Sequence, residues 1–599
     1  MKRLSVFLSI LALAAAAGFA LGGFSPAAAK TVYPEEGWRE KPDPIASEHA
    51  RRGGEIVVFG GQYPKSINYY LDNNVLSAEI FGVMFESLLT INPVTLDYEP
   101  NIAEKWSISD DKTSYTFHID PDARWSDGEP ITAFDVHWTY DTIMDPKNMT
   151  GPHKISMERF DPPEVIDSHT VRFTAKDVHW KNLLSLGGLS IMPEHAYGDK
   201  DFNKIVFDFP VVSGPYEPGR IREGTFIEFD RRDEWWQNDR PRNQNKYNFD
   251  TVTFRFFAER ENAFEAFMQG RIDLFPVYTS RIWINETTSN PFIRNHIIKQ
   301  RIFNHQPIGF QGFAMNMRRK PFEDKRVRKA MAMLLDRKKM NQTLMYNQYF
   351  LHQSYFEDLY SPENPCKNPV IEKDTRRARQ LLAEAGWKTN PDTGYLEKDG
   401  RRFTFKFLTR QAGSGRFLSI YGEDLKDAGI DMEVDQKDWS AWARDMDEFN
   451  FDMTWAAWSS GIFKDPEGMW ASGEAGRQGG ANITGFSDPE VDRLIEKQKT
   501  VFNVEERNDI YRRIDRIVFE SYPYILLWNT DYTRLLYWNK FGIPATVLSK
   551  YGDENSALWY WWADPDSDAI LKDALERDLP LPPREMNVHF DENLREGVE

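Results

Sequence analysis

Three carboxylates and a histidine lie close together in the stretch "ARWSDGEPITAFDVH" at residues 123–137. Asp127, Glu129 and Asp135 lie within it, and His137 ends it. Carboxylates close to a histidine are typical of general acid–base catalysis, in which one group gives a proton and another accepts it. The stretch therefore raises the question of whether this chain is an enzyme.

The same residues also fit a turn that leads into a helix. Ser-Asp-Gly at 126–128 is a turn sequence, because Gly128 adopts a positive φ without strain. Thr132, followed three residues later by Asp135, predicts a capping box in which Asp replaces the usual Glu or Gln. An acid in the first helical turn also suits the helix dipole. We favour this structural interpretation over a catalytic carboxylate pair.

Other catalytic and metal-binding patterns are missing from the sequence. The 11 histidines form no H-E-x-x-H motif, and with Cys366 as the one cysteine no Cys/His zinc cluster can form. "AGSGRF" (412–417) does not match a G-x-S-x-G nucleophile elbow. No phosphate-binding loop occurs, so ATP hydrolysis linked to this chain would belong to a partner protein. We expect no catalysis, no metal and no cofactor.

The first residues have the pattern of a secretory signal. Lys2 and Arg3 precede an apolar run from residue 4 to 24, and small residues follow up to Ala29. We expect cleavage after about Ala29, with an uncleaved membrane anchor as the alternative. No second apolar run of that length occurs, so we expect no transmembrane helix. Cys366 is too far along the chain to provide a lipid-modified cysteine at the cleavage point. The mature protein is expected to be soluble and periplasmic.

Length and charge narrow the class of protein. A chain of 599 residues implies two or more domains. The formal net charge of −18 disfavours a nucleic-acid partner, since such proteins are usually basic. The chain contains 19 tryptophans, and some of them must pack in the core. We expect some of them to offer flat apolar faces to a ligand.

Periodicity predicts a mixed α/β chain. Between about 400 and 460, predicted strands alternate with helices, which indicates a sheet with crossover helices. The predicted strands are 53–61, 114–119, 224–230, 251–257, 402–408, 430–435 and 451–458. The predicted helices are 75–89, 261–270, 326–336, 374–386, 488–501 and 504–520.

Several long segments resemble one family. "YTFHIDPDARWSDGEPITAFDVHWTYDTIMDP", together with the preceding "LLTINPVTLDYEPNIAEKWSISDDKTS", is very similar to the signature region of extracellular solute-binding proteins of the oligopeptide/dipeptide type. "VVSGPYEP", "GFAMNMRRKPFEDKRVRKAMAMLLDR" and "ARQLLAEAGW" follow in the family order. The resemblance covers nearly all of the chain after the signal. "NMRRKPF" and "QSYFE" further resemble the branch that includes receptors for long peptides and microcin C.

The resemblance implies a two-lobed α/β periplasmic binding protein, type II-like, with a small extra subdomain in the first lobe. Residues 30–52, after the signal peptide at 1–29, have the pattern of an irregular N-terminal arm. For the rest of the chain the resemblance implies the following division: first lobe, 53–88, 210–308 and 541–599; its extra subdomain, 89–209; second lobe, 309–540.

The resemblance also implies a function without catalysis. Such receptors enclose a peptide or peptide-like ligand between two lobes and deliver it to an inner-membrane ABC permease with its ATPase. We expect a monomer. An oligosaccharide ligand is the alternative within the family. A secreted glycoside hydrolase and a periplasmic chaperone or scaffold are the alternatives from other classes.

The resemblance places the first candidate ligand residues after the strand 451–458. Trp458 and Trp455 resemble positions that flank the bound peptide, although core packing is the alternative for both. At a spacing of three on a strand they should point to opposite faces. Gly461 stands where the family has an aspartate that anchors the peptide amino terminus. Asp465 is the candidate replacement, with a turn role beside Pro466 as the alternative.

Five further residues resemble ligand contacts, each with a structural alternative. Trp439 alternatively packs in the core or at a helix cap, and Asn482 alternatively holds a turn. Arg410 ends a strand, where it could clamp a carboxylate or remain a solvated loop charge. Asn73 and Asn74 lie in an early loop that faces the ligand in the family. Helix capping is the alternative for both.

Overall fold

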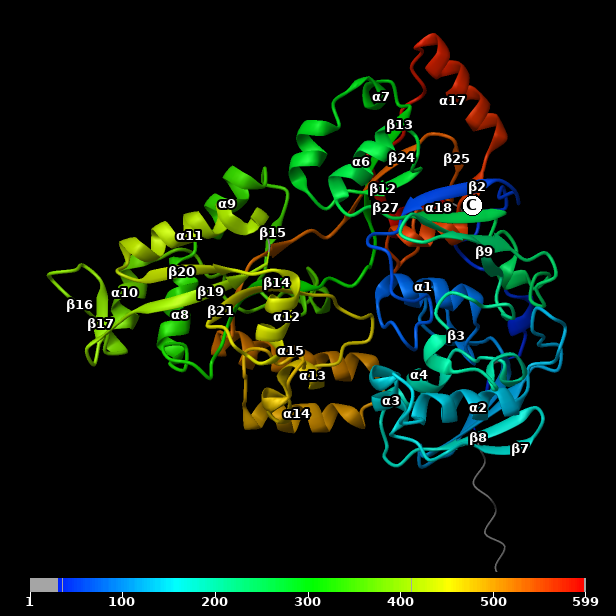
Figure 1. Ribbon diagram of the computed structural model, residues 1–599, viewed down its shortest axis with the longest axis horizontal. Helices are drawn as coiled ribbons and strands as arrows, with labels where there is room; N and C mark the ends of the chain where they lie inside the picture. Colours follow the sequence, from blue (N-terminus) through cyan, green and yellow to red (C-terminus); the bar gives the residue numbers. More distant parts are fainter. Residues whose placement is uncertain (1–30, 35, 411, 597–599) are drawn as a thin grey trace, which may run out of the picture.

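The computed structural model describes residues 31–34, 36–410 and 412–596. They form two lobes, the right and left halves of Figure 1, and the chain passes from one to the other and back. The expected signal segment, 1–29, lies outside the described residues. Within the described ranges, no helix is both long and apolar enough to cross a membrane.

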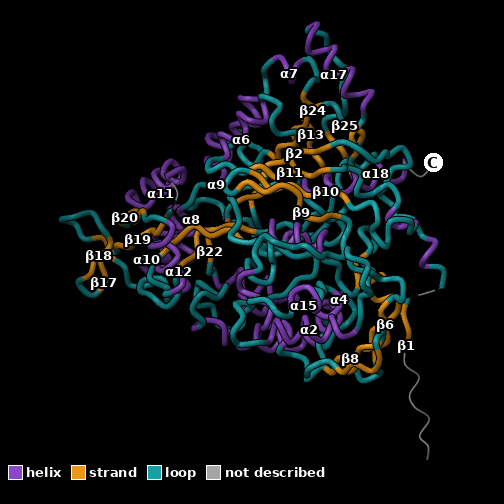
Figure 2. The backbone as a smooth tube through the Cα atoms, turned by 45° about the vertical axis from the view of Figure 1, so that its right-hand side comes forward, coloured by secondary structure: helices purple, strands orange, loops and turns teal. Residues whose placement is uncertain are grey.

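An eight-stranded mixed sheet organises the first lobe. In sheet order its strands are β27 (Asn587–His589), β13 (Ile297–Phe303), β24 (Thr533–Trp538), β12 (Leu274–Pro276), β2 (Glu55–Phe59), β11 (Thr251–Arg255), β10 (Phe226–Arg231) and β9 (Tyr216–Arg222). β2 pairs in parallel with both β11 and β12. Helix α1 (Val75–Met84) packs on one face, and α6 (Arg260–Met268) and α17 (Pro565–Arg577) pack on the other. Figure 2 shows these strands running side by side through the lobe.

The chain returns to the first lobe earlier than the family resemblance implied. The expected second lobe, 309–540, included β24, but β24 pairs with β12 and β13 of the first-lobe sheet. All six of its positions are buried, so apolar contacts on both faces fix this strand in that sheet. The second crossing therefore lies at 530–532, between β23 (Trp528–Asn529) and β24.

A five-stranded sheet forms the small subdomain of the first lobe. In sheet order its strands are β1 (Thr31–Tyr33), β5 (Ala103–Ile108), β6 (Ser114–Ile119), β8 (Thr170–Thr174) and β7 (Glu164–Asp167). The helices beside it are α2 (Ala133–Met144), α3 (Gly151–Met157), α4 (Lys181–Gly187) and α5 (Glu194–Tyr197). β1 pairs antiparallel with β5, so the arm expected to be irregular begins as an edge strand. The hairpin of β3 (Leu89–Ile91) and β4 (Tyr98–Pro100) lies between β1 and β5 in the chain.

The second lobe contains the predicted alternation of strands and helices. In sheet order its strands are β20 (Asp431–Gln436), β19 (Thr404–Thr409), β21 (Met453–Trp458), β14 (Phe310–Met315) and β22 (Tyr524–Leu526). β19 runs parallel to β20 and β21, and α11 (Gly415–Asp427) and α12 (Trp439–Asp447) make the crossovers. The prediction of a crossover sheet from about 400 to 460 is confirmed.

Separate apolar cores cover the two faces of this sheet. One contains side chains of α8 (Lys325–Leu334), α10 (Thr375–Glu384) and α11. The other contains side chains of α13 (Glu467–Trp470), α14 (Pro489–Lys499) and α15 (Val504–Ser521). Short elements complete the fold: α7 (Asn290–Ile293), α9 (Arg337–Leu344), α16 (Ala557–Tyr560), α18 (Phe590–Glu596), β15 (Phe350–Leu351), β16 (Lys388–Thr389), β17 (Leu396–Lys398), β18 (Arg401–Arg402), β25 (Phe541–Gly542) and β26 (Trp562–Ala563).

Candidate binding cleft between the lobes

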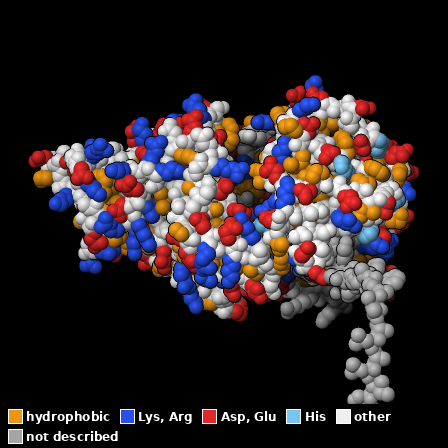
Figure 3. All heavy atoms as spheres, turned by 90° about the horizontal axis from the view of Figure 1, so that it is seen from below, with side chains coloured by type: hydrophobic (Ala, Val, Ile, Leu, Met, Phe, Trp, Pro, Cys, Tyr) orange, Lys and Arg blue, Asp and Glu red, His pale blue; other side chains and the backbone are white. Residues whose placement is uncertain are grey.

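Two chain crossings, at residues 304–309 and 530–532, join the lobes. A Cβ on Gly309 would lie 2.1 Å from the carbonyl oxygen of Trp458, so only glycine fits at the end of the first crossing. The Gly309 carbonyl also accepts a hydrogen bond from Asn529 Nδ2 at 2.8 Å. Figure 3 shows a hollow between the two halves. Two crossings beside a hollow allow lobes to close around a ligand.

In each lobe, parallel strands end at a common edge of the sheet. Ligands of open α/β sheets bind outside the carboxyl ends of the strands. In the first lobe these ends belong to β2, β11 and β12, and in the second lobe to β19, β20 and β21. The residues that follow these strands are therefore the candidate ligand contacts.

Arg410, Trp439 and Trp442 form a stacked group at the ends of β19 and β20. The guanidinium carbon of Arg410 lies 4.6 Å from the ring centroid of Trp439 and 5.2 Å from that of Trp442. The two indoles stack with centroids 5.3 Å apart. Trp439 remains 60% exposed, so the core-packing alternative does not describe it. The group presents a flat aromatic surface beside a cation.

Trp455 and Trp458 lie on opposite faces of β21, as their spacing predicts. Trp455 packs against Phe313 and donates from Nε1 to Gln311 Oε1 at 3.0 Å. Trp458 packs with the core on the other face and donates from Nε1 to Tyr524 Oη at 3.1 Å. Both side chains are half-buried. Each therefore has a structural role and keeps some accessible surface.

Asp465 lies where the small subdomain meets the second lobe. Its carboxylate pairs with the ammonium group of Lys181 at the start of α4, and its Oδ1 accepts a hydrogen bond from Glu467 N at 3.2 Å. Figure 2 shows α4 beside α15 in this region. In this arrangement Asp465 joins the lobes, and its carboxylate already has a cationic partner.

Asn482 holds a turn, as its structural alternative proposed. Its Nδ2 donates to the carbonyl oxygens of Phe486 at 2.9 Å and Ala471 at 3.2 Å, and its Oδ1 accepts from Phe486 N at 2.9 Å. The residue is 1% exposed. Its polar atoms are therefore occupied within its own loop.

The two early asparagines have different surroundings. Asn74 caps α1, because its Oδ1 accepts from Ser77 N at 2.9 Å. Asn73 is exposed and lines a shallow depression that Tyr69 and Glu79 also line. Asn73 is therefore accessible at the first-lobe side, whereas Asn74 mainly starts the helix.

A pocket that the sequence analysis missed lies at the ends of β2, β11 and β12. We call it the acidic pocket and define it by Glu79, Arg260, Tyr278 and Glu554. Burial raises the pKa of Glu79, and the charges of Asp553 and Glu554 raise it further. Glu79 is the one charged residue in "VLSAEIFGVM", the sequence of α1. A lone carboxylate in an apolar helix was the signal that could have identified this pocket.

The acids of the opening stretch stabilise local structure. Asp135 Oδ2 accepts from Thr132 N at 2.8 Å in the predicted capping box, and its other oxygen accepts from Glu194 N at 3.1 Å. Gly128 has a φ of 89°. Asp127 Oδ2 lies 2.8 Å from His195 Nε2. The structural interpretation is confirmed, and these acids form no catalytic pair with His137.

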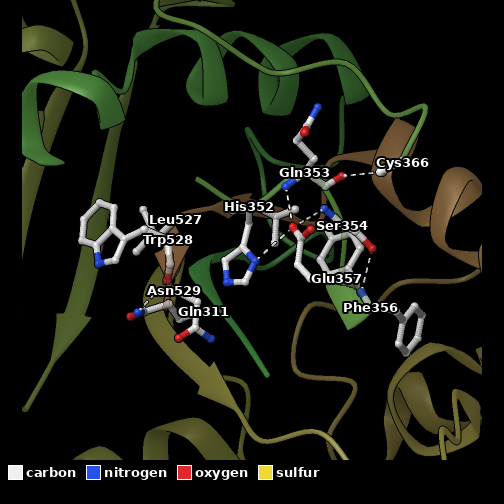
Figure 4. A network of polar contacts seen from close by, with 12 residues as sticks. Gln311, His352, Gln353, Ser354, Phe356, Glu357, Cys366, Leu527, Trp528 and Asn529 are labelled. Carbon is white, nitrogen blue, oxygen red and sulfur yellow. Dashed lines mark hydrogen bonds and ion pairs between the residues drawn. The ribbon is translucent and has the colours of Figure 1, made fainter. Parts of the chain in front are cut away.

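The "QSYFE" stretch is held by its own glutamate, as Figure 4 shows. Glu357 Oε1 accepts from Gln353 N at 2.6 Å and Ser354 N at 2.9 Å, and it lies 3.1 Å from His352 Nδ1.

Burial raises the pKa of the Cys366 thiol to about 11, so the thiol is protonated and unreactive at neutral pH. Among the described residues, no group of three or more His, Cys, Asp or Glu side chains could hold a metal ion.

Known proteins share this sequence pattern and fold. Residues 97–480 match the model of the bacterial extracellular solute-binding proteins, family 5 Middle. A probable peptide-binding protein YejA from Agrobacterium fabrum is 26% identical over 502 residues, which cover 77% of this chain and 81% of that protein.

Two solved structures have a similar fold at low identity. The oligopeptide-binding protein AppA from Bacillus subtilis, in complex with a nonapeptide, has a TM-score of 0.68 and 22% identity, covering 86% of this chain and 99% of that chain. NikZ from Campylobacter jejuni, in complex with Ni(L-His), has a TM-score of 0.68 and 20% identity, covering 87% of this chain and 100% of that chain.

Proposed function

The chain belongs to the bacterial extracellular solute-binding proteins of family 5, and we propose that it is the peptide receptor of an ABC importer. In this function the lobes enclose a peptide or peptide-like ligand. The receptor then delivers the ligand to an inner-membrane permease with its ATPase. The receptor itself carries out no catalysis.

The observation that carries this proposal is the pair of surfaces at the ends of the parallel strands. The second lobe offers the exposed stack of Trp439 and Trp442 with the Arg410 cation. The first lobe offers the acidic pocket. A peptide has apolar side chains, a polar backbone and charges of both signs, so these surfaces complement it. The nonapeptide bound to AppA and the name of the Agrobacterium relative support the same ligand class.

The compartment and assembly follow from the same function. We propose that the protein acts as a monomer in the periplasm after removal of the signal segment. The secretory pattern of the first residues and the lack of a cysteine near Ala29 support a free periplasmic protein. Washed membranes that retain the protein after salt extraction would favour an uncleaved anchor instead.

An oligosaccharide is the second candidate ligand. The 60% exposure of Trp439, stacked on Trp442, favours it, because sugar rings pack on flat aromatic faces. The position of Gly461, where the family has the aspartate that anchors a peptide amino terminus, also keeps this alternative open.

Thermal unfolding in the presence of defined ligand sets tests the proposal. Ligand-free protein would be prepared by unfolding and refolding, then heated with pooled peptides of four to nine residues or with pooled oligosaccharides. A ligand at 100 times its Kd stabilises the folded state by about 2.7 kcal/mol, so peptides should raise Tm clearly. A rise with oligosaccharides alone would favour the second candidate. Cleavage of either pool would contradict the receptor function.

A further inference from the structure

The acidic pocket has the size and shape to hold one side chain or chain end. Its volume is about 190 Å³, well above the roughly 10–15 Å³ that one water molecule needs. Apolar residues such as Phe59, Leu76 and Leu274 form its inner wall, and Glu79, Tyr278 and Glu554 supply its polar atoms.

The carboxylates of the pocket lack a cationic partner. Glu79 takes part in no ion pair or side-chain hydrogen bond among the described residues, and its Oε2 is shielded from solvent. Glu554 accepts one hydrogen bond, from Tyr278 Oη at 2.6 Å. Burying a carboxylate without a partner is costly, so Glu79 does not stabilise the fold.

The nearby arginine lowers the pKa of Glu554 through its charge, but it makes no direct ion pair with either carboxylate. Arg260 donates to the carbonyl oxygen of Pro276, and its guanidinium carbon lies 4.1 Å from the ring centroid of Tyr278. It forms no ion pair with a carboxylate of the described chain within 4.0 Å. Asp553 has a separate role, since its Oδ1 accepts from Asn555 N at 3.0 Å as a helix cap. Glu79 and Glu554 thus remain available to a ligand.

The pocket is open at the place where the lobes meet. The Tyr278 side chain is 61% exposed although its hydroxyl reaches the buried Glu554. Tyr349 of the second lobe donates from its hydroxyl to the Tyr278 carbonyl oxygen at 2.9 Å. Glu79 also lines the depression at Asn73, so the two hollows adjoin. A ligand between the lobes can reach the carboxylates from this side.

We infer that the acidic pocket binds a positively charged group of the ligand, with Glu79 as the main acceptor and Glu554 as the second. The group is an ammonium or a guanidinium, from a side chain or from a free amino terminus. This inference rests on the proposed peptide-receptor function and narrows its substrate class to peptides that carry a positive charge.

Burial and mutual repulsion support this assignment. Burial, followed by the charges of Asp553 and Glu554, raises the pKa of Glu79. Burial, followed by the charge of Asp553, raises the pKa of Glu554. A bound cation stabilises the ionised carboxylates and reverses that shift. Binding should therefore release protons. The heat of binding will then depend on the ionisation enthalpy of the buffer.

Calorimetry with matched peptides tests the inference. The probes are Ala-Ala-Lys-Ala-Ala and its norleucine counterpart, each with a free and an acetylated amino terminus. A lost charge-assisted hydrogen bond corresponds to roughly 10- to 100-fold in Kd. The doubly neutral peptide is the acetylated norleucine peptide. We expect the wild type to bind it roughly 10- to 100-fold more weakly than the best cationic peptide. If acetylation weakens binding, the amino terminus occupies the pocket; if norleucine weakens binding, the lysine side chain does.

Variants separate the pocket from the rest of the cleft. Glu79→Gln should weaken binding of the best cationic peptide roughly 10-fold and leave the doubly neutral one unchanged. Glu194→Gln, at an exposed carboxylate in the first turn of α5, is the matched control and should change neither. Equal binding of all four peptides by wild type and Glu79→Gln would overturn the inference and leave the proposed function intact. No binding of any peptide would contradict both.

Discussion

Trp180 Nε1 donates a hydrogen bond to Gln498 Oε1 at 2.6 Å, and this bond joins the small subdomain to α14 of the second lobe. Trp180 N also donates to the Lys499 carbonyl oxygen at 2.9 Å. The guanidinium carbon of Arg507 lies 4.2 Å from the ring centroid of Trp180, which is 7% exposed. Because these contacts span the two lobes, they stabilise the arrangement in which the lobes touch.

Trp180→Phe should shift the protein toward more open lobes. The change keeps most of the ring packing and removes the indole donor, at a cost of roughly 1 kcal/mol. Small-angle scattering of the ligand-free protein should show a larger radius of gyration than for the wild type, and peptide affinity should fall about fivefold. Identical scattering curves and affinities would show that this contact does not govern closure.

Asp465 and Lys181 should behave as a coupled pair across the lobes. If Asp465 acts through Lys181, Asp465→Asn, Lys181→Met and the double variant should weaken peptide binding by similar amounts, so the coupling energy is on the order of 1 kcal/mol. If Asp465 instead anchors the ligand amino terminus, Asp465→Asn alone should be harmful. Calorimetric titration of the four proteins with one peptide distinguishes these results.

Trp439 and Trp458 should separate binding from stability. Trp439 is exposed, so Trp439→Ala should change the free energy of unfolding by less than about 0.5 kcal/mol and weaken ligand binding. Trp458 packs on a core and bonds Tyr524, so Trp458→Ala should cost roughly 2–4 kcal/mol of stability. Denaturant unfolding and titration of both variants check this. Reversed effects would place Trp439 in the core and Trp458 at the ligand.

Glu79→Gln should stabilise the ligand-free protein at neutral pH. Because folding raises the pKa of Glu79, the folded wild type loses stability as pH rises through that pKa, whereas glutamine does not ionise. The variant should therefore have the higher free energy of unfolding, and the difference should grow as pH rises. The difference should shrink as pH falls toward 4.5 and below, because Glu79 then becomes protonated in the unfolded state as well as in the folded state. Calorimetric melting of both proteins across pH 4.5–8 measures the difference in stability. A difference that does not change with pH, or a less stable variant, would contradict the prediction.

The local patterns were predictable where short-range chemistry decides the structure. The capping box at Asp135, the alternation of Trp455 and Trp458, and the crossover sheet of the second lobe all follow from spacing along the chain. Asn74 and Asn482 were assigned ligand roles from the family resemblance, with capping and turn roles as alternatives. Their hydrogen bonds match those alternatives.

Long-range placement was not predictable from periodicity. β24 reads as an apolar strand, and its sequence does not reveal which lobe supplies its neighbours. Lys181 and Asp465 are 284 residues apart, so no spacing rule brings them together. The acidic pocket is assembled from α1, the end of β12 and the loop before α16. Glu79 alone gave a local signal, through its isolation in an apolar helix.

Mass spectrometry of the protein as purified from its own cells tests the central claim most directly. Intact receptor would be sprayed under native conditions, and the released ligands would then be sequenced. The account predicts a ladder of masses that fragment as peptides of several residues, most of them carrying lysine, arginine or a free amino terminus. Released masses in hexose multiples, with no peptide fragments, would contradict it.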